Sequence, residues 1–120
     1  LRQAQEVVLI AAAVQAPGNV TPTAEFNVWF DPAAAHTVLN SGAKIVVIPL
    51  DVTHHLIFTE AMAQQITQAH ATTPLAQFLL QLCRFMTQTA LTYRETAGVP
   101  GFLVHDAATI AYLLYPELFT

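Results

Sequence analysis

Val7-Val8-Leu9-Ile10 and Ile45-Val46-Val47-Ile48 are the two runs that decide the fold. Each is short, apolar and rich in β-branched residues, and neither alternates with polar residues. Such runs are typical of strands buried on both faces of a parallel sheet. Between them, Asp31-Pro32 followed by Ala33 to Asn40 predicts a helix with Asp31 as its N-cap. This order predicts a βαβ unit, and hence an α/β fold with mainly parallel strands and flanking helices.

Further elements are predicted downstream. The segments from Thr59 to His70 and from Pro74 to Glu95 are rich in apolar residues and lack internal proline, which favours two helices. Phe102-Leu103-Val104 then predicts a last short strand, and Asp106 opens a final helix. His105 and Asp106 should therefore lie at a strand-to-helix junction, where open α/β sheets bind their ligands.

The composition suggests a surface that is partly covered. The chain has 120 residues, of which 54% are hydrophobic and 10% are charged, and its formal net charge is −4. Globular proteins carry about 25% charged residues. We therefore expect one domain at most, with apolar surface covered by a second copy or by the rest of a larger domain. The first residue, Leu1, is not methionine, which favours a piece of a larger domain.

Several classes of partner are not expected. The only Lys and Arg residues are Arg2, Lys44, Arg84 and Arg94. They form no basic stripe for a nucleic acid. The longest strongly apolar stretch, Val7 to Val14, falls far short of the roughly 20 residues that span a bilayer, and it lacks the charged flank and cleavage pattern of a signal peptide. We expect a cytoplasmic protein without a membrane span. Cys83 has apolar neighbours at helical spacing and is expected in the core.

In so apolar a chain, a cluster of polar side chains stands out: Asn19, Thr21, Thr23, Glu25 and Asn27, with Trp29 among them. Carboxylate and amide groups together suit a polyol, because a sugar hydroxyl both donates and accepts hydrogen bonds. The same side chains could instead cap turns and the next helix. Glu25 and Asn27 would share a face only in an extended or irregular backbone, because two helical steps set them about 200° apart.

The pair His105-Asp106 is a second candidate. A histidine can protonate a leaving group near neutral pH, and a neighbouring aspartate can bind a metal or a hydroxyl. Asp106 also suits the N-cap of the final helix, but this alternative leaves His105 unexplained. Asp51 and Thr53 are expected to fix the turn after the second strand.

Four motifs follow one another along the chain: Pro17-Gly18-Asn19-Val20-Thr21-Pro22-Thr23-Ala24-Glu25-Phe26-Asn27 with Asp31-Pro32-Ala33-Ala34-Ala35, Val47-Ile48-Pro49-Leu50-Asp51-Val52-Thr53-His54, Phe102-Leu103-Val104-His105-Asp106, and Tyr115-Pro116-Glu117-Leu118-Phe119. Together they resemble the nucleoside hydrolase family of the inosine-uridine preferring type. The resemblance covers nearly the whole chain. It implies a partial nucleoside-hydrolase-like (Rossmann-like) fold, in which residues 1–120 are the C-terminal part of a single domain.

Enzymes of that family hydrolyse the N-glycosidic bond of ribonucleosides to free base and ribose, with a bound Ca²⁺. The resemblance implies that Asn19, Glu25 and Asn27 bind ribose hydroxyls. It also implies that Asp106 binds ribose and ligates calcium, and that His105 is the catalytic residue that protonates the departing base. These roles suit the reaction, because breaking the C–N bond builds positive charge on the ribose and negative charge on the base.

Two departures from the family matter. The family's calcium site depends chiefly on an N-terminal Asp-Thr-Asp-Pro-Gly-x-Asp-Asp segment, which includes the general base and is missing from this chain. Ca²⁺ takes about six to eight oxygen ligands, of which Asp106 with sugar and water supplies a minority. The chain also has Ala11-Ala12-Ala13 where the family tends to have Gly-Gly, a pair that permits positive φ or close backbone approach.

The missing segment leaves two hypotheses. Either the chain works in a nucleoside hydrolase together with a companion segment that supplies the metal site, or it is an inactive, truncated remnant that folds or self-associates. In both cases we expect that the isolated chain does not hold Ca²⁺. Absent early strands would leave an unpaired sheet edge, and we therefore expect a homo-oligomer.

Overall fold

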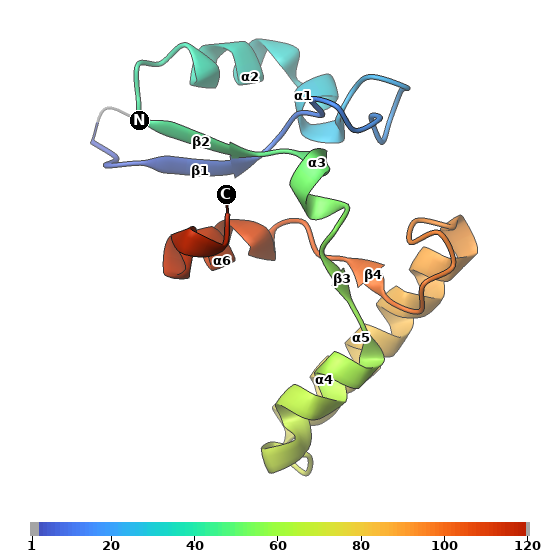
Figure 1. The fold of residues 1–120 in the computed structure, drawn as a ribbon. Helices are drawn as coiled ribbons and strands as arrows, with labels where there is room; N and C mark the ends of the chain where they lie inside the picture. Colours follow the sequence, from blue (N-terminus) through green and yellow to red (C-terminus); the bar gives the residue numbers. More distant parts are fainter. Residues whose placement is uncertain (1–2, 120) are drawn as a thin grey trace. The chain divides into compact units, whose positions relative to one another are not determined.

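The structure is a computed structural model that describes residues 3–119, so Arg2, one of the four cationic residues, lies outside the described residues. The chain forms two compact units (Figure 1). The first joins the part of the chain up to Thr53 with the part from His105 onward, and the second is His54–Val104. All five predicted site residues belong to the first unit.

The first unit is built on a parallel pair of strands. β1 (Val7–Ile10) and β2 (Ile45–Ile48) lie where the sequence predicts them, with Val7 opposite Ile45 and Ile10 opposite Ile48. Parallel strands of this apolar kind need cover on both faces. Figure 1 shows α2 (Pro32–Leu39) on one face and α6 (Ala107–Leu114) on the other. The α/β class is confirmed.

Local signals fix the start and end of α2. Asp31 is its N-cap, as predicted, and the carboxylate accepts a hydrogen bond from Ala34 N–H at 2.9 Å. Pro32 stands at the first helical position, where no intrahelical partner for an N–H exists. Beyond the helix, Gly42 has a φ of +73°, which glycine adopts without strain.

A short helix, α1 (Phe26–Phe30), forms where the sequence predicts none. The loop before it depends on Gly18. A Cβ at this position would lie 2.4 Å from the backbone N and O of Ala24 and from the backbone O of Thr21. Only glycine allows this close approach, which brings the preceding loop onto the start of α1. The first unit also contains α3 (Leu50–Thr53) and a 3₁₀ turn, η2 (Pro116–Leu118).

The second unit contains the two longer helices where they were predicted. α4 (Glu60–Thr67) continues into a 3₁₀ turn, η1 (Gln68–His70), and α5 (Pro74–Tyr93) follows it. Hydroxyls at Thr59 and Thr73 cap the two helices. The helices pack against each other, and Arg84 Nε lies 2.6 Å from Glu60 Oε1 across them.

The last predicted strand forms, but not in the parallel sheet. β4 (Phe102–Leu103) pairs antiparallel with β3 (Ile57–Phe58) in a separate two-stranded sheet. The sequence did not predict β3, because two residues are too short to show a period. Parallel pairing therefore holds for β1 and β2, and not for the strand that precedes His105.

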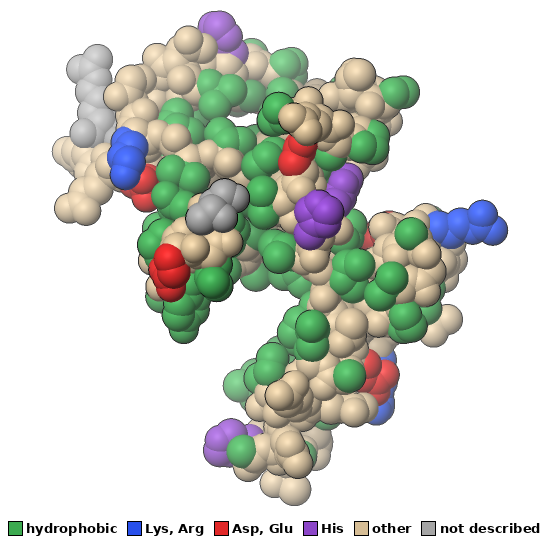
Figure 2. All heavy atoms as spheres, viewed as in Figure 1, with side chains coloured by type: hydrophobic (Ala, Val, Ile, Leu, Met, Phe, Trp, Pro, Cys, Tyr) green, Lys and Arg blue, Asp and Glu red, His purple; other side chains and the backbone are tan. Residues whose placement is uncertain are grey.

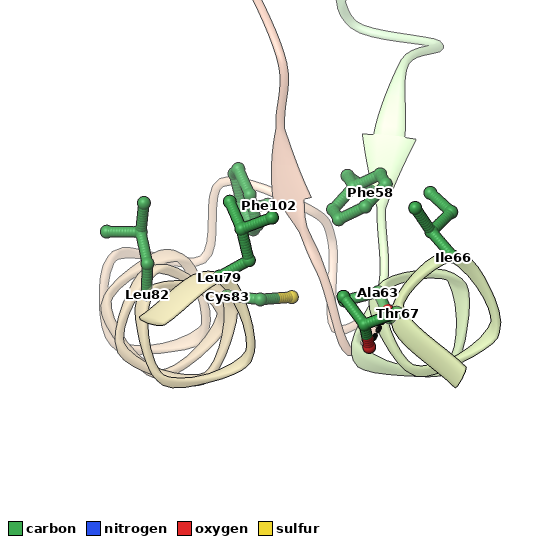
Figure 3. A pocket seen from close by; sticks show the side chains of 8 residues that line it. All are labelled: Phe58, Ala63, Ile66, Thr67, Leu79, Leu82, Cys83 and Phe102. Carbon is green, nitrogen blue, oxygen red and sulfur yellow. Dashed lines mark hydrogen bonds between the residues drawn. The ribbon is translucent and has the colours of Figure 1, made fainter. Parts of the chain in front are cut away.

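Cys83 belongs to the core of the second unit, as predicted, and is 2% exposed. Figure 3 shows its side chain between α4 and α5, beneath the rings of Phe58 and Phe102. These side chains line an apolar groove of about 190 Å³. Burial raises the pKa of the Cys83 thiol, so the reactive thiolate is disfavoured and the residue acts as a packing group.

Much apolar surface remains open to solvent. Trp29 in α1 and Phe85 in α5 are among many large apolar side chains that are more than half exposed. Charged side chains are few on the face shown in Figure 2. Within residues 3–119, no helix combines the length and hydrophobicity that a membrane crossing requires.

Candidate functional site

One pocket of the first unit gathers the predicted site residues. It has a volume of about 250 Å³ and lies where the end of β1, the start of α1 and the junction before α6 meet. Its lining consists of Ile10, Asn19, Glu25, Phe26, Asn27, Leu50, His105 and Asp106. The segment around Asn19 and the pair His105-Asp106, far apart in sequence, therefore face a common space.

Glu25 anchors this pocket. Its side chain is 3% exposed, and one carboxylate oxygen accepts a hydrogen bond from Asn27 N–H at 2.8 Å. The other oxygen accepts from Val28 N–H and from Ala12 N–H, each at 3.2 Å. Glu25 is thus the N-cap of α1 and also holds the loop after β1. The sequence allowed two alternatives for Glu25, a helix cap or a pocket residue, and in the structure the side chain is both.

The side-chain amides of Asn19 and Asn27 have opposite orientations. Their backbone hydrogen-bond partners determine which amide atom is the oxygen and which is the nitrogen. Asn19 Oδ1 accepts from Phe26 N–H at 2.8 Å, and a backbone N–H can only donate. Asn27 Nδ2 donates to Ile10 O at 3.2 Å, and a carbonyl can only accept. Asn19 therefore keeps its Nδ2 as a further donor, and Asn27 keeps its Oδ1 as a further acceptor. The pocket carries one amide of each kind.

Ala12 occupies the place where the resemblance anticipated glycine, and its φ is +70°. Its N–H donates to Glu25, and its C=O accepts from Leu50 N–H at 3.0 Å. This left-handed conformation costs an alanine roughly 1–2 kcal/mol. The two hydrogen bonds stabilise this conformation, so Ala12 adopts a positive φ that glycine would adopt without strain.

Asp51 fixes the same loop from the other side. Its carboxylate accepts from the N–H groups of Val14, Gln15 and Ala16 at 2.8, 2.7 and 2.9 Å. These hydrogen bonds, that from Val14 first, lower the pKa of Asp51 to about 2. The sequence assigned Asp51 to the turn after β2, whereas the structure shows that it organises the loop after β1.

His105 is tied to Thr53, and the sequence missed this contact. Nδ1 of the imidazole lies 2.9 Å from Thr53 Oγ1, and Thr53 is 0% exposed. The sequence assigned Thr53 to the turn after β2. The two residues are 52 positions apart, and nothing in the local sequence pattern around either of them indicates the contact.

Asp106 directly precedes α6, as predicted, but its carboxylate makes no capping hydrogen bond to that helix. The alternative in which Asp106 simply caps the helix is therefore wrong. The remaining polar residues of the first cluster have other positions. Thr21 Oγ1 accepts from Ala24 N–H within the loop, and neither Thr23 nor Trp29 lines the pocket.

The described residues do not fit a calcium site by themselves. No three His, Cys, Asp or Glu side chains among them lie close enough together to hold a metal ion. Three amides already occupy the Glu25 carboxylate, which leaves Asp106 as the available acid of the pocket. One carboxylate falls far short of the roughly six to eight oxygens that Ca²⁺ takes.

The fold is a Rossmann-like α/β arrangement, and its pocket is lined by amide, carboxylate and imidazole groups. A family profile described as "Inosine-uridine preferring nucleoside hydrolase" matches residues 1–120. The chain belongs to this nucleoside hydrolase family.

Individual relatives agree with this assignment. The chain is 36% identical to the inosine-uridine preferring nucleoside hydrolase of Leishmania major, over 97% of this chain and 35% of that protein. It is 40% identical to the pyrimidine-specific ribonucleoside hydrolase RihA of Shewanella woodyi, over 97% of this chain and 36% of that protein. The chain spans about a third of the length of these relatives.

Solved structures show the same fold. A purine-preferring ribonucleoside hydrolase from Gardnerella vaginalis superposes with a TM-score of 0.85 and 30% identity. The match covers 96% of this chain and 35% of that chain. The plant nucleoside hydrolase PpNRh1 superposes with a TM-score of 0.79 and 27% identity over the same shares.

The Asp51 contacts predict a pH dependence. The folded-state pKa of about 2 lies below the ordinary value of 3.8, so the stabilisation is complete above about pH 4 and is lost as the pH falls toward 2. We expect the Tm of the chain to fall more steeply across this window than the Tm of Asp51→Asn, as measured by circular dichroism. Glu117→Gln, which removes an exposed carboxylate, is the control and should follow the parent chain. Equal slopes for Asp51→Asn and the parent chain would contradict the assignment.

Proposed function

We propose that this chain is the ribose-binding and acid-bearing part of a ribonucleoside hydrolase, corresponding to the C-terminal part of the single catalytic domain. The observation that carries the proposal is the pocket that gathers Asn19, Glu25, Asn27, His105 and Asp106. Its volume of about 250 Å³ is below the roughly 300–1,000 Å³ of complete small-molecule sites. A space of this size suits the sugar rather than a whole nucleoside.

The orientation of the amides supports a sugar ligand. Each hydroxyl of a vicinal diol donates one hydrogen bond and accepts others. Asn19 offers a donor through Nδ2, and Asn27 offers an acceptor through Oδ1. A carboxylate has roughly four lone-pair sites, so the three amides on Glu25 leave about one for a hydroxyl. Donor, acceptor and carboxylate together match the two hydroxyls of a ribose.

The second half of the pocket supports cleavage of the bond to the base. As the C–N bond breaks, negative charge builds on the base, and a positioned imidazole can neutralise it by donating a proton. His105 lines the same pocket as the two amides. In this proposal Asn19, Glu25 and Asn27 hold the sugar, His105 serves the departing base, and Asp106 faces the sugar and the metal.

The isolated chain should lack turnover, because residues 3–119 contain no group of side chains that makes up a calcium site. We expect no release of ribose from inosine or uridine by the purified chain, with added Ca²⁺ or with a chelator. We also expect no saturable binding of Ca²⁺ below about 1 mM in calorimetry. Chelator-sensitive turnover that Asp106→Ala abolishes would show that the chain is complete, and would overturn this part of the proposal.

The sugar contacts can be tested apart from catalysis. In Asn19→Asp one oxygen still accepts from Phe26 N–H, while the donor Nδ2 becomes a second acceptor. We expect an unchanged Tm and an affinity for inosine that falls about tenfold, from NMR titration. Asn27→Asp is the contrasting variant. It places an oxygen against Ile10 O and should lower the Tm as well.

2′-Deoxyinosine, which lacks one of the two hydroxyls, should bind the parent chain more weakly than inosine. Equal affinity of Asn19→Asp and the parent chain for inosine would refute the proposed contact.

The open surface supports self-association. Among the described strands, β1 and β2 pair only with each other, so each keeps an unpaired edge. An apolar groove of about 250 Å³ also lies beside β1, against α1 and α2. In the absence of the rest of the domain, a second copy is the available cover. We expect the purified chain to form a homo-oligomer, and a monodisperse monomer in light scattering would contradict this expectation.

A further inference from the structure

We propose that Thr53 is a positioning residue for His105. In the neutral state its hydroxyl donates to Nδ1, which fixes the plane of the imidazole and keeps the ring proton on Nε2. The catalytic meaning of this contact rests on the proposed function, because it assumes that His105 serves the departing base. The contact and the tautomer can be tested without any activity.

The first observation is the burial of the hydroxyl. Thr53 is the last residue of α3, the short helix that follows β2, and it is 0% exposed. Its Oγ1 lies 2.9 Å from His105 Nδ1, across 52 positions of sequence. A fully buried hydroxyl at hydrogen-bond distance from Nδ1 constrains the orientation of the pocket histidine.

The second observation is the direction in which the hydroxyl points. Several helical threonines in this chain bond back to the carbonyl four residues earlier, as Thr37 does to Ala33 O and Thr67 to Ala63 O. Thr53 makes no such bond. Its side chain has His105 as its only hydrogen-bond partner among the described residues.

The tautomer follows from counting donors. A hydroxyl has one proton, and a buried O–H without an acceptor is unfavourable. If Nδ1 carried the ring proton and donated to Thr53, the Thr53 O–H would be left without an acceptor. The neutral pair is therefore arranged with Thr53 as donor, Nδ1 as acceptor and the proton on Nε2.

The arrangement leaves Nε2–H as the ring donor that is available to the departing base, because Thr53 occupies Nδ1. Valine at position 53 would offer Nδ1 no hydrogen bond, so neither the plane of the ring nor its tautomer would be fixed.

The test is two-bond ¹H–¹⁵N NMR of the ¹⁵N-labelled chain near pH 8, with the His105 signals assigned by comparison with His105→Gln. We expect an excess of the Nε2–H form at His105 of at least tenfold, larger than that of the exposed His55 and His70. In Thr53→Val the excess should fall to the level of these exposed histidines. Thr53→Ser, which keeps the hydroxyl, should restore it.

Thr67→Val is the matched control, because it removes another buried threonine hydroxyl that bonds only within α4. It should leave the His105 signals unchanged. A dominant Nδ1–H form in the parent chain, or an unchanged excess in Thr53→Val, would overturn the proposal. If Thr53→Val does not fold, the parent chain and Thr53→Ser still decide, since an excess no larger than that of His55 also refutes it.

Titration with inosine separates this proposal from the proposed function. Inosine should shift the His105 signals if His105 faces the bound nucleoside. A confirmed tautomer with no response to inosine would leave Thr53 as the positioning residue of His105, and would refute the assigned role of the pocket.

Discussion

The site depends on a buried carboxylate held by backbone amides. Glu25 accepts from Asn27, Val28 and Ala12, and no ion pair with a described cationic side chain neutralises it. Its charge is instead stabilised by N–H donors, two of which belong to the free start of a helix. These bonds join α1 to the end of β1. Asn19 and Asn27 are held against the same two elements, so their free amide groups face the pocket only while Glu25 keeps its contacts.

The loop after β1 is the second half of this arrangement. Glu25, Leu50 and Asp51 hold residues 12–16 through five hydrogen bonds, which explains how alanine persists at a φ of +70° in position 12. Strain of this kind persists where the surroundings over-determine the backbone. Asp51 and Thr53 come from one short helix, α3. That helix therefore holds the loop after β1 through Asp51 and the His105 imidazole through Thr53.

The proposed sugar-binding role of the pocket is compatible with the family relationship. The printed names of the relatives differ in the base they mention, from inosine and uridine to pyrimidines and purines. The pocket described here offers amide, carboxylate and imidazole groups around a space of sugar size. In the proposed function these groups face the ribose and not the base, which is compatible with the different bases in those names.

Local patterns in the sequence determined the elements whose signals lie within a few residues. The apolar runs gave β1 and β2, Asp31-Pro32 gave the start of α2, and uninterrupted periodic segments gave α4 and α5. The motifs also gave the family and the candidate residues. Only the tertiary structure decided which donor and acceptor atoms of those side chains are used in backbone hydrogen bonds and which face the pocket. The short elements α1 and β3 have too few residues for a period, and Glu25, Asp51 and Thr53 reach partners 13 to 52 positions away. Such contacts depend on how distant segments pack, and no local pattern encodes that packing.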